Sequence, residues 1–176
     1  MSWRIEAEQV ELLVVDAQEK LLPAMHQAEI LEKKLGQLIE ACVILGVPVS
    51  FSEQYPKGLG RTLTSLKKLA PGAPTHEKTR FSAGEFGNKL ERKKILVAGV
   101  ETHICLRQTV YDLSRQGKTV IVVADATSSR CVQNKELALS EFVADKIFIT
   151  SVEALLFEFL QDAEHPKFKE ISNLIK

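Results

Sequence analysis

The chain has 176 residues, 45% of them hydrophobic and 26% charged, which is an ordinary balance for one globular domain, residues 1–176, with a buried core. Lysine plus arginine and aspartate plus glutamate both total 23, so the formal net charge is zero. This excludes recruitment of nucleic acid or an anionic membrane by the electrostatic field of the whole protein. No apolar run is long enough to span a membrane. Three cysteines without C-x-x-C spacing exclude a disulfide framework or a zinc cluster, and together with an N-terminus that lacks an apolar signal core they predict a cytoplasmic protein.

Short apolar runs without alternation predict strands that are covered on both faces. The predicted strands cover residues 11–16, 47–51, 75–78, 95–98, 119–124 and 146–150. The first strand ends on Asp16, the third ends on Lys78, and Asp125 follows the fifth. After the second strand, residues 53–60 are expected to form a polar loop at the rim of a site.

Helices are predicted between these strands. Leucines at spacings of three and four give the first helix one apolar stripe, which includes Cys42. The predicted helices cover residues 28–45, 61–69, 86–90, 103–116, 134–144, 152 onward and 166 onward. Thr102, Asn134 and Ser151 are expected to cap three of them. This alternation predicts an α/β fold, a three-layer α/β/α sandwich whose six-stranded sheet is mostly parallel and Rossmann-like.

Parallel strands bring their carboxyl ends to one edge of the sheet, where open α/β folds bind their ligands. Asp16, Lys78, Gly99 and Asp125 are therefore expected to converge at this edge. Two of these residues also allow simpler interpretations. Asp16 taken alone could equally be a helix cap or a loop carboxylate. Lys78 taken alone has the pattern of a solvated lysine in a charged loop.

The segment I-L-V-A-G-V-E-T-H-I-C-L at residues 95–106 combines a buried strand, a glycine and the start of a helix. Gly99 allows the chain to turn sharply. Cys105 would then lie in the first helical turn, where free backbone N–H groups and the helix dipole favour a thiolate. Such an arrangement can provide a nucleophile. The alternative is that Cys105 is a buried cysteine that serves as a small hydrophobic residue.

Asp16, Lys78 and Cys105 together can perform acyl transfer through a thioester. Asp16 can accept the thiol proton and return it during the reaction, while Lys78 can hold Asp16 ionised and favour the thiolate. The Val100–Glu101 turn and the N–H of Cys105 can donate hydrogen bonds to a developing oxyanion. His103 is the competing base, but a spacing of two residues on a helix directs it away from Cys105, so we expect it at the rim.

Four motifs occur in order along the chain. They are L-L-V-V-D-A-Q at residues 12–18, E-K-T-R-F-S at 77–82, A-G-V-E-T-H-I-C at 98–105 and V-A-D-A-T-S-S-R at 123–130. With these motifs the chain resembles the isochorismatase-like cysteine hydrolases, a superfamily that includes nicotinamidases and N-carbamoylsarcosine amidases. The segments S-E-Q-Y-P-K-G-L-G and H-P-K-F-K-E-I-S-N-L-I-K are similar to those of short members whose substrates are mostly unassigned.

The resemblance implies a catalytic triad of Asp16, Lys78 and Cys105. It also implies a cis peptide bond between Val100 and Glu101, which directs the backbone amides of Glu101 and Cys105 at the oxyanion. Nicotinamidases hold a metal with an aspartate and histidines after the second strand; that region has no histidine here, so we expect no metal and no cofactor. Members of the superfamily commonly form dimers, tetramers or larger rings, so the resemblance implies a homo-oligomer.

The sequence thus predicts a cysteine hydrolase that acts on a small-molecule amide or a related substrate. The candidate substrate contacts are Gln18, Tyr55, Phe81, Glu101, His103 and Thr127. The alternative is a catalytically silent binding or scaffold protein with the same fold. Dinucleotide binding is not indicated, because D-A-Q stands where a G-x-G-x-x-G motif would follow the first strand.

Overall fold

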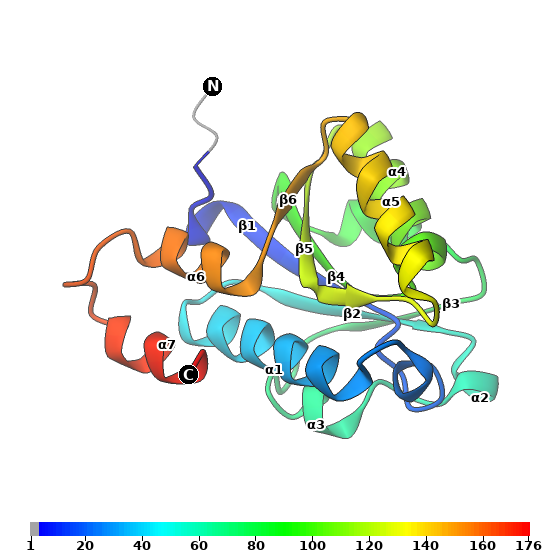
Figure 1. Cartoon of the computed structure of the whole chain (residues 1–176), viewed down its shortest axis with the longest axis horizontal. Helices are drawn as coiled ribbons and strands as arrows, with labels where there is room; N and C mark the ends of the chain where they lie inside the picture. The colour runs from blue at the N-terminus through cyan, green and yellow to red at the C-terminus, as the bar shows by residue number, and fades with distance from the viewer. Residues whose placement is uncertain (1–3) are drawn as a thin grey trace.

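A computed structural model describes residues 4–176 and places a six-stranded sheet between two layers of helices (Figure 1). The strand order is β3-β2-β1-β4-β5-β6, and each neighbouring pair is parallel. The strands are β1 (Val10–Val15), β2 (Val49–Gln54), β3 (Thr75–Lys78), β4 (Lys94–Val100), β5 (Thr119–Ser128) and β6 (Phe148–Thr150). The predicted α/β/α sandwich with a parallel sheet is confirmed.

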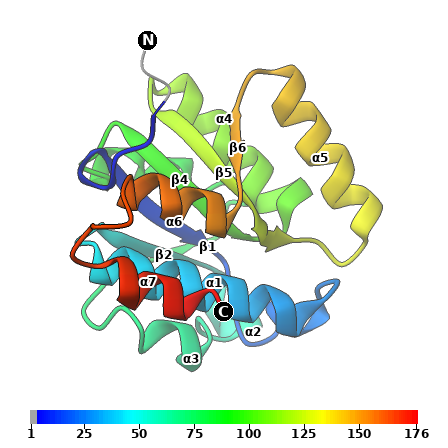
Figure 2. The same cartoon turned by 60° about the vertical axis from the view of Figure 1, so that its left-hand side comes forward.

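Helices cover both faces of the sheet (Figure 2). They are α1 (Ala28–Ile44), α2 (Pro56–Leu59), α3 (Thr64–Lys67), α4 (Arg107–Arg115), α5 (Val132–Ala144), α6 (Val152–Leu160) and α7 (Phe168–Leu174). One hydrophobic cluster joins α1, α3, α6 and α7 to the sheet, and a second joins α4 and α5 to its other face. Alternate residues of β1 divide between them: Leu12 and Val14 belong to the first cluster, Leu13 and Val15 to the second. Burial on both faces explains why the strands are apolar throughout.

The strand order reverses between β1 and β4, which lie side by side in the centre of the sheet. From β1 the chain proceeds outward through β2 to β3, and from β4 it proceeds outward through β5 to β6. Ligands of open α/β sheets bind beyond the carboxyl ends of the strands at such a reversal. Val15, at the end of β1, pairs with Gly99 of β4. Asp16 and the turn after Gly99 therefore lie next to each other at this point.

The structure corrects the predicted polar loop at residues 53–60, because β2 continues to Gln54 and α2 follows it. Ser52, Glu53 and Gln54 are buried despite their polarity, since each side chain is hydrogen-bonded inside the protein. The helix predicted over residues 61–69 shortens to α3, and residues 86–89 belong to a 3₁₀ helix, Gly84–Lys89. Within residues 4–176, no helix has both the length and the apolar character needed to cross a membrane.

Of the three predicted helix caps, only one is confirmed. Ser151 Oγ accepts a hydrogen bond of 3.3 Å from a backbone N–H of α6. Thr102 caps no helix, because its hydroxyl lies 2.9 Å from the hydroxyl of Thr127 and binds there instead. Asn134 lies inside the first turn of α5 rather than before it.

Asp125 does not reach the predicted convergence point, and this expectation is wrong. β5 runs on past Asp125 to Ser128, so Asp125 lies within the strand rather than at its end. Its carboxylate accepts a 2.7 Å hydrogen bond from the N–H of Val152 and forms an ion pair with Lys34 at 3.4 Å. Asp125 thus joins α6 and α1 to the sheet.

Gly99 is constrained by the backbone of the neighbouring strand. Its φ is +112°, and a Cβ at this position would lie 2.0 Å from the carbonyl oxygen of Val15. We expect Gly99→Ala to lower the free energy of unfolding by at least ~3 kcal/mol, because the central strand pair must separate to accept the methyl group. Urea denaturation measures this loss.

Gly117→Ala is the matched control. Gly117 also has a positive φ, +81°, but apart from Gly117 and its two chain neighbours, no atom of the described residues lies within 4 Å of the place that an alanine methyl group would occupy. Only backbone strain of about 1–2 kcal/mol is therefore expected. Equal losses in the two variants would show that the contact between Gly99 and Val15 does not constrain the fold.

Candidate active site

Asp16 is the residue that directly follows β1, and it is fully buried. Its φ of +51° is left-handed, a conformation that aspartate adopts more readily than most residues. Its Oδ1 accepts a 2.7 Å hydrogen bond from Ser52 Oγ, and its Oδ2 lies 2.6 Å from Nζ of Lys78. One carboxylate oxygen is thus held from the neighbouring strand β2 and the other from β3, the strand beyond it.

Lys78 is the last residue of β3, and its side chain is completely buried. Besides Asp16, its Nζ donates to Oε1 of Gln54 at 2.8 Å and to the carbonyl oxygen of Phe81 at 2.8 Å; the carbonyl oxygen of Arg80 lies farther away at 3.3 Å. A buried ammonium is tolerated only when it is paired and hydrogen-bonded. Lys78 meets this condition, so it is a buried partner of Asp16 rather than a solvated lysine.

Cys105 lies in a single π-helical turn, Thr102–Leu106, between β4 and α4, and it is 7% exposed. Burial raises the pKa of its thiol to about 12, and the negative charge of Asp16 acts in the same direction. The charge of Lys78 and the backbone N–H of Glu101 lower this pKa, but by less. The resting thiol is therefore neutral. The expected thiolate is wrong for this state, because burial and Asp16 outweigh the groups that favour charge.

The turn that carries the predicted oxyanion donors begins with a cis peptide bond between Val100 and Glu101. The Glu101 side chain is directed away from the thiol, since its Oε2 accepts 3.0 and 3.2 Å hydrogen bonds from N and Nε of Arg130. The Glu101 backbone N–H lowers the pKa of the Cys105 thiol, against the larger effect of burial. Glu101 thus secures the turn with its carboxylate.

Two of the candidate substrate contacts bind the protein itself. Gln18 is fully buried, and its amide is hydrogen-bonded to both backbone groups of Gln54 and to the carbonyl oxygen of Gly60. Thr127 is 1% exposed, and its hydroxyl donates to the carbonyl oxygen of Gly99 at 2.7 Å. Neither side chain has a face directed toward a substrate, so both act as internal supports.

Tyr55, Phe81 and His103 lie nearer the surface. Tyr55 and Phe81 are each 54% exposed, and Tyr55 lines a hollow of about 360 Å³ together with Lys78. His103 Nδ1 lies 2.9 Å from Ser129 Oγ, so its ring is engaged with the end of β5 rather than with the thiol. These residues form the accessible surroundings of the site.

Sequence reasoning missed Ser52 and Gln54, the two residues of β2 that hold Asp16 and Lys78. Gln54 lies in the stretch interpreted as a loop, and Ser52 lies between that stretch and the predicted second strand. Their signal was alternation: residues 52 and 54 continue the strand with a period of two, which places both side chains on one face of the sheet. Within the described part of the chain, no group of three or more histidine, cysteine, aspartate or glutamate residues is placed to hold a metal ion.

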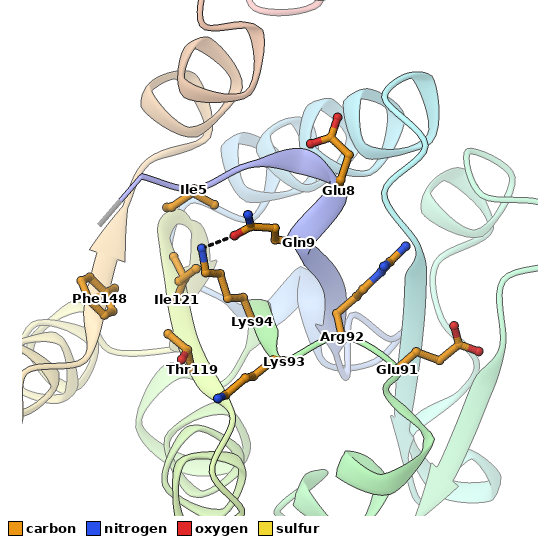
Figure 3. A pocket seen from close by; sticks show the side chains of 10 residues that line it. All are labelled: Ile5, Glu8, Gln9, Glu91, Arg92, Lys93, Lys94, Thr119, Ile121 and Phe148. Atoms are coloured by element: carbon orange, nitrogen blue, oxygen red, sulfur yellow. Dashed lines mark hydrogen bonds between the residues drawn. The ribbon is translucent and has the colours of Figure 1, made fainter. Parts of the chain in front are cut away.

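A larger hollow of about 650 Å³ lies at the opposite edge of the sheet (Figure 3). Ile5, Lys94, Ile121 and Phe148 are among its lining residues, and Lys94 marks the beginning of β4. The triad lies beyond the other end of the same strands, ~20 Å away at about 3.3 Å per residue. This hollow is therefore separate from the triad.

Asp16→Asn tests the balance of charges on the thiol. The change removes the negative charge that raises the pKa of Cys105 and leaves the opposing charge of Lys78. Asparagine also accepts the left-handed backbone of this position. We expect iodoacetamide to alkylate Cys105 about tenfold faster or more at pH 8, because the thiolate fraction rises tenfold for each unit by which the pKa falls. Peptide mass spectrometry measures the rate.

Cys42 is the internal control for this experiment. Burial alone raises the pKa of its thiol to about 12, so the rate at Cys42 should stay the same in both proteins. A Cys105 that reacts more slowly in Asp16→Asn, or equally fast, would be incompatible with a carboxylate that acts directly on the thiol.

The chain is similar to known proteins in sequence and in structure. The model of the isochorismatase domain matches residues 11–154. Over 170 residues, 93% of this chain and 85% of the relative, the sequence is 37% identical to isochorismatase domain-containing protein 2 of Danio rerio. The structure of MAR1 ribonuclease from Caenorhabditis elegans superposes with a TM-score of 0.92 at 35% identity and covers 98% of this chain and 92% of that one. An octameric hydrolase of unknown specificity from Escherichia coli shares the fold, with a TM-score of 0.85 at 18% identity over 99% of this chain and 96% of that one. This chain therefore belongs to the isochorismatase family, whose members are hydrolases.

Proposed function

We propose that this protein is a cysteine hydrolase that cleaves a small amide, or a related carbonyl substrate, through a thioester on Cys105. The observation that carries the proposal is the buried pair of Asp16 Oδ2 and Lys78 Nζ, 2.6 Å apart, with Cys105 near enough that the charge of Asp16 raises the pKa of its thiol. A neutral thiol beside a carboxylate is suited to attack that is coupled to proton transfer.

In the proposed reaction, Sγ of Cys105 attacks the substrate carbonyl carbon while Asp16 takes the thiol proton. The backbone N–H groups of Glu101 and Cys105 stabilise the oxyanion. When the tetrahedral intermediate collapses, the C–N bond breaks and Asp16 gives its proton to the leaving amine. A water molecule then attacks the thioester and gives a proton to Asp16, and this proton returns to Sγ as the carboxylic acid is released. Lys78 keeps Asp16 in place throughout.

The wider setting follows from the same proposal. The chain acts as a single domain in the cytoplasm, without a metal or another cofactor, on a small-molecule substrate. It forms a homo-oligomer, and the octameric neighbour from Escherichia coli supports this part of the proposal. Tyr55, Phe81 and His103 are the side chains that contact the substrate, since the other candidates are bound within the protein.

A second candidate function is cleavage of RNA, because the Caenorhabditis elegans relative is described as a ribonuclease. The zero net charge of this chain argues against it, since binding to the phosphate backbone depends on an excess of basic side chains. Incubation with labelled RNA separates the two functions: cleavage that disappears in Cys105→Ala would replace amide hydrolysis by this second activity. A wild type that turns over neither amides nor RNA would favour the silent binding or scaffold protein.

Cys105→Ala is the direct test of the nucleophile. We expect it to lower the hydrolysis rate at least ~10³-fold on any small amide that the wild type cleaves in a panel assayed for ammonia release, because no thioester can form. Cys131→Ala is the matched control, since Cys131 is also a free cysteine but is exposed; its rate should equal that of the wild type. Hydrolysis by Cys105→Ala at the wild-type rate would refute the triad.

A further inference from the structure

The ammonium group of Lys78 has all its hydrogen-bond donors occupied within the chain. An ammonium has three N–H bonds. Its three short contacts are to Asp16 Oδ2 at 2.6 Å, Gln54 Oε1 at 2.8 Å and the carbonyl oxygen of Phe81 at 2.8 Å. Lys78 therefore has no donor left for a substrate or for the thiol. Lys78 thus contributes a positive charge at a fixed position. The residues that fix the position of Nζ then matter for the site as well.

Gln54 is the one side chain other than Asp16 among these three contacts. The orientation of its amide follows from its second partner: Nε2 donates to the carbonyl oxygen of Thr79 at 2.8 Å, and a carbonyl oxygen can only accept. Oε1 must then face Lys78. Gln54 is 8% exposed, and its backbone N–H and carbonyl oxygen are both hydrogen-bonded to the amide of Gln18, at 2.7 and 3.0 Å.

Residues at the ends of three strands thus come together at Nζ of Lys78. Asp16 follows β1, Gln54 ends β2 and Lys78 ends β3, and Gln54 and Lys78 are directly paired in the register of the sheet. The flexible stem of a lysine does not by itself place its ammonium group, because it loses much rotational freedom on being ordered. Gln54 supplies a second side-chain contact to Nζ at 2.8 Å, and its amide is itself fixed by the carbonyl oxygen of Thr79.

We propose that Gln54 is a positioning residue of the site, which acts through Lys78 by holding its Nζ on Asp16. Its part in catalysis rests on the proposed function, because the position of Lys78 matters there for keeping Asp16 ready to take the thiol proton. Its part in positioning is independent of any substrate. The charged side chains that act on the thiol of Cys105 are Asp16 and Lys78, so a displaced ammonium changes the titration of that thiol.

Gln54→Met tests the proposal, because methionine keeps the unbranched shape of glutamine and loses both hydrogen-bonding groups. With Nζ less firmly held, Lys78 lowers the pKa of Cys105 less effectively. We expect the pH profile of Cys105 alkylation by iodoacetamide to move upward by about one pH unit, which makes alkylation about tenfold slower at pH 8. If the wild type hydrolyses an amide, kcat should fall about tenfold or more, with KM within about twofold of the wild-type value, because Gln54 does not contact the substrate.

Gln37→Met is the matched control. Gln37 is also buried, at 7% exposure, and its Nε2 also donates to a backbone carbonyl oxygen, that of Leu174, but it lies on α1 away from the triad. We expect this variant to lose thermal stability without any change in the alkylation profile of Cys105. A merely structural Gln54 would behave in the same way, so identical profiles for wild type, Gln37→Met and Gln54→Met would overturn the proposal.

Gln54→Glu is the second variant, for the case that Gln54→Met does not fold. It keeps an oxygen against Lys78 but adds a negative charge, so it should also move the alkylation profile of Cys105 upward. An unchanged profile in a folded Gln54→Glu would overturn the proposal as well. Because alkylation needs no substrate, failure of the proposed hydrolase function appears separately, as an inactive wild type with the expected alkylation shifts.

Discussion

The site depends on a buried ion pair between Asp16 and Lys78. Two charges inside a protein lose their hydration, and only close pairing with further hydrogen bonds makes their burial tolerable. Here Asp16 is held by Ser52 as well as by Lys78, and Lys78 by Gln54 and by the backbone at Phe81. Removal of either charge would leave the other buried without a partner. The parallel sheet meets this demand because three adjacent strands, β1, β2 and β3, end close together.

The pair also influences the protonation state of Cys105, the proposed nucleophile. Asp16 opposes ionisation of Cys105 while Lys78 favours it, and burial adds to the effect of Asp16. The result is a thiol that stays protonated until a carbonyl group is in place, with its proton acceptor already beside it. Such a cysteine is protected from unspecific oxidation and alkylation, because these reactions need the thiolate. Reactivity at this site would then require the correct geometry of a bound substrate.

The fold and the three residues of the proposed triad could be predicted from the sequence. The residues that hold these three in place could not. Apolar runs and helical stripes have clear periods, and the parallel arrangement follows from their alternation. Polar side chains with buried partners show no such period: Gln54 was interpreted as part of a loop, Ser52 was placed in no element, and Asp125 was interpreted as the residue after a strand although β5 continues beyond it. The thiolate expected at Cys105 failed for a related reason, since sequence does not show how deeply a helical turn is buried.

The buried residues of the site are held in place by backbone groups and by internal side chains. The exposed side chains at its rim take no part in holding them. The N–H of Tyr55 donates to the carbonyl oxygen of Lys78, and the carbonyl oxygen of Phe81 accepts from its ammonium, yet both aromatic rings are more than half exposed. The backbone groups at these two positions do not depend on the aromatic rings, although the left-handed backbone at Tyr55, with a φ of +38°, disfavours proline and β-branched residues there. Replacement of these two side chains therefore leaves the backbone contacts of Lys78 in place. Under the proposed function, single substitutions at this rim change the specificity while Asp16, Lys78 and Cys105 keep their arrangement.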